Sequence, residues 1–184
     1  MFRLAIAILV VVTCSAPDKP KPLDRAKTEN SNALIKEHKN KLAVTASTFW
    51  QGWEPEKLID DNLEKSWFSA KDDNIAINKD KEKAPWVKIE FPRDEVVNRV
   101  TIYGNREKPW EKDYSVLSGK LELFDADGKV LFTKDDEGKG DHKDFDFLME
   151  KPIKMVRAIR FVVLGDEGDK NPCRDVALGE IRVE

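Results

Sequence analysis

The stretch VTASTFWQGWEPEKLIDDNLEKSW, residues 44–67, holds the features around which the rest of the chain is expected to be organised. It begins with an alternating segment, 44–48, that is typical of a short β-strand. An aromatic loop at 49–53 follows, and Pro55 is placed to start a single helical turn. An acidic tight turn at 60–62 then leads to a Ser-Trp pair that closes back on a core. A strand, a ligand-sized loop and an oxygen-rich turn in one short stretch indicate a binding module more than an enzyme.

Alternating apolar and polar residues indicate further strands along the chain. In the segment ending at Phe91, the side chains of Val87, Ile89 and Phe91 are expected to face inward, and Pro92 is expected to stop the strand. The turn sequence DADG at 125–128 predicts a β-hairpin. Strands are expected at 44–48, 85–91, 96–103, 120–124, 129–133, 145–147, 155–164 and 176–183. Short strands without a long helix favour an antiparallel β-sandwich, an all-β fold.

The composition argues against several classes of function. Of 184 residues, 36% are charged, yet the formal net charge is only −3. Nucleic-acid binding needs a concentrated basic face, whereas acidic and basic residues alternate here. The histidines His38 and His142 have neither a neighbouring nucleophile nor the clustered spacing of a zinc site. We therefore expect no nucleic-acid partner and no enzymatic activity.

The first residues have the pattern of a bacterial export signal. Arg3 supplies a positive charge, and nine apolar residues follow at 4–12. A membrane-spanning helix needs about 20 apolar residues, so the segment is interpreted as a signal and not as a membrane span. The segment VVTC resembles the lipid-attachment box of bacterial lipoproteins, which predicts a signal peptide at 1–13 and a lipid on Cys14. Ordinary cleavage after Ala16 is the alternative.

Residues 14–41 are expected to form an extended tether, because prolines alternate with Lys and Asp at its start. A lipid on Cys14 would leave Cys173 without a disulfide partner within the chain. A disulfide between the two cysteines is the alternative. In the lipid-modified chain, Cys173 is expected to be a small buried residue near the start of a strand.

The residues from 42 to 184 resemble the discoidin, or coagulation-factor type C, family. The resemblance is carried by the strand ending in Ala-Ser, by the turn at Asp60 and by Trp67. A Tyr-Gly-Asn loop at 103–105 and an Asp-x-x-x-x-Glu-Ile ending are similar to the bacterial variant described as a glycan-binding or NAD-glycohydrolase-translocation domain. The resemblance implies a jelly-roll-like, galactose-binding-like sandwich of about eight strands over residues 42–184.

The aromatic loops predict a carbohydrate site. Sugar rings stack on Trp or Tyr, while their hydroxyls bind amide or charged groups at the rim. The resemblance implies that the ligand is held by loops at one end of the sandwich. The residues of this binding site are expected to be Trp50, Trp53, Asn105, Arg106, Trp110, Asn171 and Arg174.

Structural roles are the alternatives for several of these residues. For one of the aromatic residues at 49–53 the alternative is a packed lid. For Arg106 and Arg174 the alternative is a solvated surface charge. Trp110 has few apolar neighbours in sequence and is expected to be exposed. The resemblance places Trp67 and Trp86 in the core.

The resemblance also implies a structural Ca²⁺ ion near the acidic turn, because hard oxygen ligands suit this cation. The matching ligands are Asp60, Asn62, Ser66 and Glu180. The alternative is that Asp60 caps the turn while Glu180 pairs with a basic side chain.

Together these patterns predict a non-catalytic, carbohydrate-binding surface lipoprotein of the bacterial cell envelope. Its lipid anchor is expected in the outer membrane or at the cell surface. One alternative is an adhesin that binds host matrix protein or phospholipid through the same loops. Another is an accessory scaffold for an envelope complex. The glycan hypothesis requires the indole rings to lie bare at a common rim.

Overall fold

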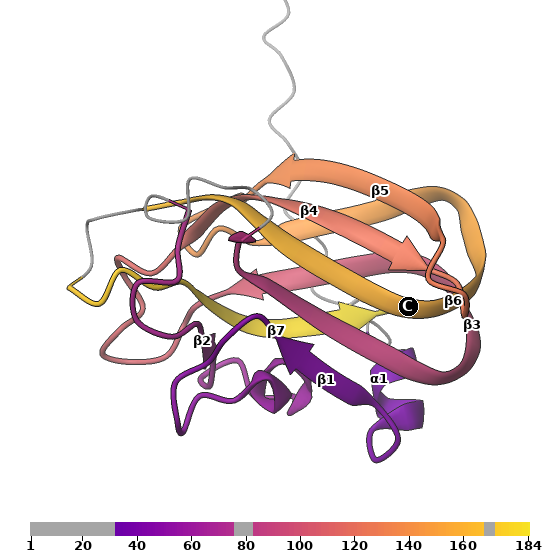
Figure 1. Cartoon of the computed structure of the whole chain (residues 1–184), viewed down its shortest axis with the longest axis horizontal. Helices are drawn as coiled ribbons and strands as arrows, with labels where there is room; N and C mark the ends of the chain where they lie inside the picture. The colour runs from indigo at the N-terminus through magenta and orange to yellow at the C-terminus, as the bar shows by residue number, and fades with distance from the viewer. Residues whose placement is uncertain (1–31, 76–82, 168–171) are drawn as a thin grey trace, which may run out of the picture.

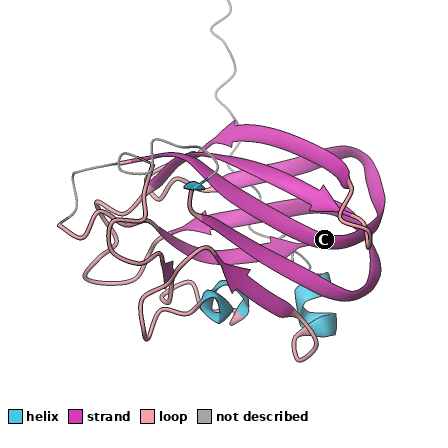
Figure 2. Cartoon of the chain, viewed as in Figure 1, coloured by secondary structure: helices cyan, strands magenta, loops and turns pink. Residues whose placement is uncertain are grey.

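The computed structural model describes residues 32–75, 83–167 and 172–184 (Figure 1). The regular secondary structure of the described residues is mostly β-strand, with a short α-helix, α1 (Ala33–His38), and a 3₁₀ helix, η2 (Pro55–Ile59) (Figure 2). The strands are β1 (Ala43–Ala46), β2 (Trp67–Phe68), β3 (Trp86–Gly104), β4 (Val116–Phe124), β5 (Val130–Glu137), β6 (Phe145–Asp166) and β7 (Ala177–Val183). The predicted signal peptide, Cys14, the predicted tether as far as residue 31, and Asn171 lie outside the described residues.

The strands form a continuous antiparallel sheet that folds over into two layers. Its order is β2-β7-β3-β6-β4-β5, and β1 pairs with β3 on the side of that path. The first half of β3 pairs with β1 and with the second half of β6, whereas its second half pairs with β7 and the first half of β6. Both long strands therefore run through both layers. The predicted antiparallel sandwich is confirmed.

The number of strands differs from the prediction because two expected breaks are bends. Residues 85–91 and 96–103 belong to β3, and residues 145–147 and 155–164 belong to β6. The pairing of β3 with β6 shifts register between Glu90 and Arg99, which is the signature of β-bulges. Proline is tolerated in a strand at such irregular positions, so Pro92 lies at the bend without ending the strand. These two mergers would leave six strands, and β2, which was not expected as a strand, brings the described residues to seven.

The core lies between the two layers. Trp67 is completely buried and donates its Nε1–H to the carbonyl oxygen of Thr48 at 3.0 Å. Phe145, Phe147 and Phe161 form a buried aromatic cluster with ring centroids 5.0–6.3 Å apart. Trp67 therefore has the core position that the family resemblance implies.

Residues 32–41, assigned to the tether from the sequence, are part of the folded body. Ile35 of α1 is buried in the core, and His38 is also buried, with its Nε2 atom 2.8 Å from Glu95 Oε1. Within the ranges described, no helix is both long and apolar enough to cross a membrane.

The bends of β3 and β6 lie at one end of the sandwich, on the right in Figure 1. The aromatic loop at 49–53 and the loops before β4 and β7 gather at the opposite end. Residues far apart in sequence are therefore brought together at this loop end.

Candidate functional site

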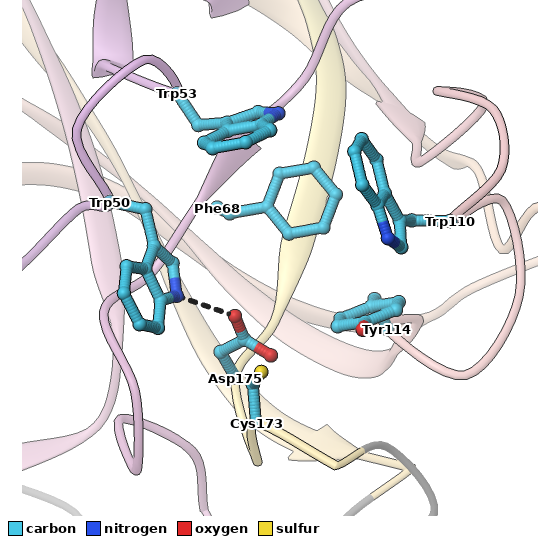
Figure 3. Close-up of a pocket in the computed structure, with 7 residues that line it drawn as sticks. All are labelled: Trp50, Trp53, Phe68, Trp110, Tyr114, Cys173 and Asp175. Carbon is cyan, nitrogen blue, oxygen red and sulfur yellow. Dashed lines mark hydrogen bonds between the residues drawn. The ribbon is translucent and has the colours of Figure 1, made fainter.

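A pocket of about 220 Å³ opens at the loop end and is lined mostly by aromatic side chains (Figure 3). Its lining comes from the loop before η2, from β2, from the loop between β3 and β4, and from the segment before β7. The lining residues are Trp50, Trp53, Phe68, Trp110, Tyr114, Cys173 and Asp175.

Four rings of the pocket, those of Trp53, Phe68, Trp110 and Tyr114, are held together by edge-to-face contacts. Trp53 and Trp110 lie with centroids 5.5 Å apart at 83°, and Phe68 lies 5.3 Å from Tyr114 at 72°. Phe68 also contacts the edges or faces of both Trp53 and Trp110. It is 5% exposed, whereas Trp50 and Trp110 are 37% and 38% exposed. Phe68 thus forms the base against which the rings of Trp53, Trp110 and Tyr114 are held.

Asp175 is the only carboxylate in the described lining, and it holds Trp50 in place. Trp50 Nε1 donates a hydrogen bond to Asp175 Oδ2 at 2.8 Å. Asp175 is 3% exposed, and this burial raises its pKa to about 6, although the Trp50 hydrogen bond acts to lower it. Burial, together with the neighbouring charge of Asp175, also raises the pKa of Tyr114. The base of the pocket therefore carries a negative charge that water screens poorly.

Trp53 is held by a second buried carboxylate. Its Nε1 donates to Glu107 Oε1 at 3.1 Å, and the backbone N–H of Ser66 donates to Glu107 Oε2 at 2.8 Å. Asn105 supports the same loop, because its Oδ1 accepts hydrogen bonds from the Ser66 hydroxyl and from the backbone N–H of Glu107. Its Nδ2 donates to the carbonyl oxygen of Trp110. This network positions the loop that carries Trp110.

The residues expected to bind ligand are divided by the structure into two groups. Trp50, Trp53 and Trp110 come together in the pocket. Asn105 is 3% exposed and lies beneath the pocket in the network just described. Arg106 is turned away: it pairs with Asp144 at 2.7 Å and stacks over Tyr103. Neither Asn105 nor Arg106 lines the pocket, so we leave both out of the proposed binding set.

Arg174 also lies outside the pocket lining. Its Nη2 forms an ion pair with Asp72 Oδ1 at 3.0 Å, and its backbone has a positive φ of 52°. In this conformation Arg174 separates Cys173 and Asp175, which both line the pocket. Asn171 lies beyond the described residues.

Sequence reasoning did not include Phe68, Tyr114, Cys173 and Asp175 in the site. Phe68 follows the buried Trp67 directly, and strand alternation indicates that the two side chains face opposite sides. This signal was available in the sequence. No comparable pattern distinguishes Asp175 from the neighbouring charges. Cys173, expected to be buried, is half-buried and lies at the pocket edge.

Trp86 differs from the expected core position. It is half-buried and lines a second depression, of about 390 Å³, on the outer face of the sheet. The reason is register: Val87, Ile89 and Phe91 face the core, so Trp86 and Lys88 face outward. We call this depression the sheet-face groove; it is lined by Trp86, Lys88, Glu90, Phe124, Asp125, Ala126, Gly128, Arg157, Ala158 and Arg160.

The side chains expected to bind calcium are only partly brought together. Glu180 is completely buried, and its pKa is raised to about 8, first by burial and then by the nearby charge of Asp60. Its Oε2 atom has no hydrogen-bond partner among the described residues. Asn62 Oδ1 instead accepts a hydrogen bond from the Glu64 backbone, and the Ser66 hydroxyl donates to Asn105. Asp60 and Glu180 therefore offer the oxygen ligands that a hard cation binds, while the other two side chains are engaged elsewhere.

The described residues contain no group of three or more His, Cys, Asp or Glu side chains placed to hold a metal ion. Asp60 also accepts a hydrogen bond from the Asn62 backbone at 2.9 Å, which caps the acidic turn. The capping role weighed from the sequence is therefore present in the structure.

A jelly-roll-like sandwich with an aromatic pocket at its loop end defines a class of galactose-binding-like modules. The family model described as "F5/8 type C domain" matches residues 43–175. The chain belongs to this family. A search of curated proteins returned no match.

Solved structures with the same fold include sugar-binding modules. A fucose-binding module of Streptococcus pneumoniae is 14% identical with a TM-score of 0.59, covering 84% of this chain and 97% of that one. The family 32 CBM of C. perfringens NanJ, solved with galactose, is 11% identical with a TM-score of 0.58, covering 77% and 92%. A chitosan-binding module from Paenibacillus sp. IK-5 is 16% identical with a TM-score of 0.55, covering 77% and 93%. At these identities the likeness establishes the fold.

Proposed function

We propose that this protein is a non-catalytic carbohydrate-binding module and that the aromatic pocket is its binding site. The observation that carries the proposal is the gathering of Trp50, Trp53 and Trp110 around one opening at the loop end. Neighbours with the same fold are described as binding fucose, galactose or chitosan, which supports a sugar ligand in general.

The pocket would bind a sugar by stacking and by hydrogen bonds to Asp175. The partly exposed faces of Trp50 and Trp110 are available to the C–H face of a pyranose ring. Asp175 Oδ2 accepts the hydrogen bond from Trp50. Because a carboxylate can accept several hydrogen bonds, Asp175 would also accept from ligand hydroxyls while it keeps the indole in place. The packed rings are pre-ordered, so binding would require little rearrangement.

A glycan array tests this proposal with Trp110→Ala and, as a matched control, Trp86→Ala. Both variants remove a partly exposed indole, but only Trp110 lines the aromatic pocket. We expect glycan binding to be lost in Trp110→Ala and kept in Trp86→Ala. Unchanged binding in Trp110→Ala and in Trp50→Ala would refute the proposed site.

We propose, as a finer assignment, that the protein is a bacterial lipoprotein anchored through Cys14 in the cell envelope, at the outer membrane or cell surface. The support is the sequence pattern of residues 1–14. Within the family, the loop at 103–105 supports a place near the NAD-glycohydrolase-translocation variant. Metabolic labelling with a fatty-acid analogue should modify the wild-type chain and leave Cys14→Ala unmodified.

Adhesion to a membrane or a matrix protein is the second candidate function. The observation in its favour is that Phe49, next to Trp50, is 49% exposed, so two aromatic side chains are accessible in this loop. Exposed aromatic residues can insert at a membrane interface. A liposome pull-down distinguishes the candidates, because only membrane adhesion requires Phe49 and retains protein without any glycan.

We also propose a structural calcium ion held by Asp60 and Glu180. The unpaired buried oxygen of Glu180 and the neighbouring charge of Asp60 support it. Because ligand that binds only the folded state stabilises it, added Ca²⁺ should raise the melting temperature and a chelator should reverse this change. The response should disappear in Glu180→Gln. If added Ca²⁺ does not change the melting temperature, the calcium proposal is wrong and the two carboxyls are a neighbouring acid pair without a cation.

A further inference from the structure

The aromatic pocket has the composition of a cation-binding cage. Its described lining consists of five aromatic rings, one thiol and one carboxylate. The rings are arranged around the opening, with Phe68 between Trp53, Trp110 and Tyr114 (Figure 3). Aromatic faces attract organic cations through the negative charge above the ring, and such cages recognise ammonium groups.

Carboxylates at the ring edges increase this preference for positive charge, chiefly Asp175, because Glu107 is already paired with Lys65 at 3.7 Å. Trp50 donates its Nε1–H to Asp175 at 2.8 Å, and Trp53 donates its Nε1–H to Glu107 at 3.1 Å. Each indole is therefore hydrogen-bonded to a carboxylate that is at least nine-tenths buried. Negative charge placed at the ring edge makes the ring face more attractive to a cation and occupies the N–H that would otherwise donate to a sugar oxygen.

The donors expected at the rim of a neutral-sugar site lie elsewhere. Arg106 pairs with Asp144, Arg174 pairs with Asp72, and the Asn105 amide supports the loop beneath the pocket. Besides aromatic faces, the described lining offers one carboxylate, Asp175, which carries a negative charge. A cationic group is attracted both by the ring faces and by this carboxylate, so it matches the lining better than a neutral hydroxyl does.

We propose that the ligand presents an organic ammonium group to this pocket, seated between the rings of Trp50 and Trp110 and facing Asp175. The inference rests on the proposed function and narrows the ligand to a glycan that carries positive charge, either as an amino sugar or through a quaternary-ammonium substituent. The pocket volume of about 220 Å³ is below that of drug-sized sites, so it takes one small group of a larger ligand.

The electrostatics of Asp175 agree with this geometry. Burial raises the pKa of its carboxyl to about 6, so the group is ionised at neutral pH but incompletely solvated. An ammonium group near its oxygen atoms would replace the missing solvation. A neutral ligand would not compensate for the incomplete solvation of the Asp175 carboxylate, and it would exclude further water from this charge.

Calorimetric titration of the full chain with matched pairs of small probes tests the inference. The first pair is choline and 3,3-dimethylbutan-1-ol, which have the same shape but differ in charge. The second pair is galactosamine and galactose. We expect the charged member of at least one pair to bind at least tenfold more tightly, and the pair that responds identifies the source of the ammonium group.

The matched variant is Asp175→Asn, in which the amide oxygen still accepts from Trp50 Nε1. It should remove the preference for the cation, so that the charged and neutral members of the responding pair bind with similar affinity. Equal affinities within both pairs in the wild-type chain would overturn the inference.

The outcomes separate this inference from the proposed function. Binding of galactose without preference for galactosamine, lost in Trp110→Ala, would keep the carbohydrate site and reject the ammonium ligand. Binding of choline with no glycan bound on an array would keep the cation cage and reject the carbohydrate function. A failure of every probe and every glycan would reject both.

Discussion

The aromatic pocket and the sheet-face groove differ in a way that size does not capture. The groove is the larger, at about 390 Å³ against 220 Å³, and it also contains two aromatic rings, Trp86 and Phe124. Its lysine and arginine side chains, however, are already paired with carboxylates. Lys88 lies 2.6 Å from Glu90, and Arg160 lies 2.6 Å from Glu122 and stacks over Phe124.

In the aromatic pocket, by contrast, the polar contacts orient rings whose faces remain open. Asp175 and Glu107 hold the indoles of Trp50 and Trp53 by their edges. The charged side chains of the groove are therefore occupied by ion pairs at the sheet surface, while the ring faces of the pocket remain available for a ligand. The comparison indicates that available chemistry, and not volume, identifies the binding site.

The largest expected effect separates the two regions by removing one indole from each. Trp53→Ala deletes a ring that contacts Phe68 and Trp110 and should lower ligand affinity about 100-fold or more. It should also cost about 3 kcal/mol of unfolding free energy, because a packed ring is replaced by a cavity. Calorimetric titration and urea denaturation measure the two effects.

Trp86→Ala is the control for this prediction. Its ring lies in the sheet-face groove, so ligand affinity should stay within about twofold of wild type. If Trp86→Ala weakens binding as much as Trp53→Ala, the groove takes part in recognition and the contrast between the two regions fails.

The second prediction concerns the carboxylate beneath the pocket. Glu107→Ala leaves the buried N–H groups of Trp53 and Ser66 without their acceptor, which should cost about 1–3 kcal/mol of unfolding free energy. Glu107→Gln keeps an acceptor oxygen and should lose less. Urea denaturation measures the difference between the two variants. Equal stability of Glu107→Ala and wild type would show that this network does not hold the pocket.

The third prediction is a pH dependence that only the pocket should show. The pKa of Asp175 is raised from 3.8 to about 6, so the carboxyl becomes protonated as pH falls from 7 to 5. The other titratable groups in the described lining of the pocket are Tyr114 and Cys173. Affinity for an ammonium probe should therefore fall up to about tenfold between pH 7 and pH 5, as measured by titration at each pH.

The stability of the unliganded protein should move in the opposite direction. Because the pKa of Asp175 is higher in the folded state than in the unfolded state, its contribution to stability is complete below pH 3.8. This contribution is lost as pH rises through 6. Asp175→Asn should remove this part of the pH profile. An unchanged profile in that variant would place the titration on another group.

The fold was predictable because strand alternation is a strong local signal. The inward positions Val87, Ile89 and Phe91 were assigned correctly, and the DADG turn joins β4 to β5 as expected. The continuity of β3 through Pro92 was not predictable, because a bulge that accommodates proline depends on the pairing with β6. The same alternation places Trp86 outside, and the family resemblance led to the wrong position for this residue.

The site was predictable only in its aromatic part. Loop side chains follow no period, so the sequence does not indicate that Arg106 turns to Asp144 while Trp110 turns to the pocket. Asp175 is equally inconspicuous among neighbouring charges, and its importance comes from burial and from the Trp50 hydrogen bond. Both depend on loops that meet only in the folded chain.

The smallest expected effect tests the groove by itself. Burial alone would raise the pKa of Glu122, but hydrogen bonds from Lys120 and Arg160 hold the pKa below its ordinary value. Arg160→Met keeps apolar contact with Phe124 and removes one of these partners, while Lys120 remains 3.0 Å away. Because partly exposed ion pairs contribute little, the variant should lose less than about 1 kcal/mol of unfolding free energy at pH 7. Because the pKa of Glu122 is lowered in the folded state, its ionised carboxylate stabilises the fold at pH values above its unfolded-state pKa. This contribution is lost as pH falls. The difference between Arg160→Met and wild type should therefore shrink in acid, as measured by urea denaturation at pH 7 and pH 3.5. Any loss of glycan affinity in this variant would show that the paired charges of the groove are not confined to the sheet.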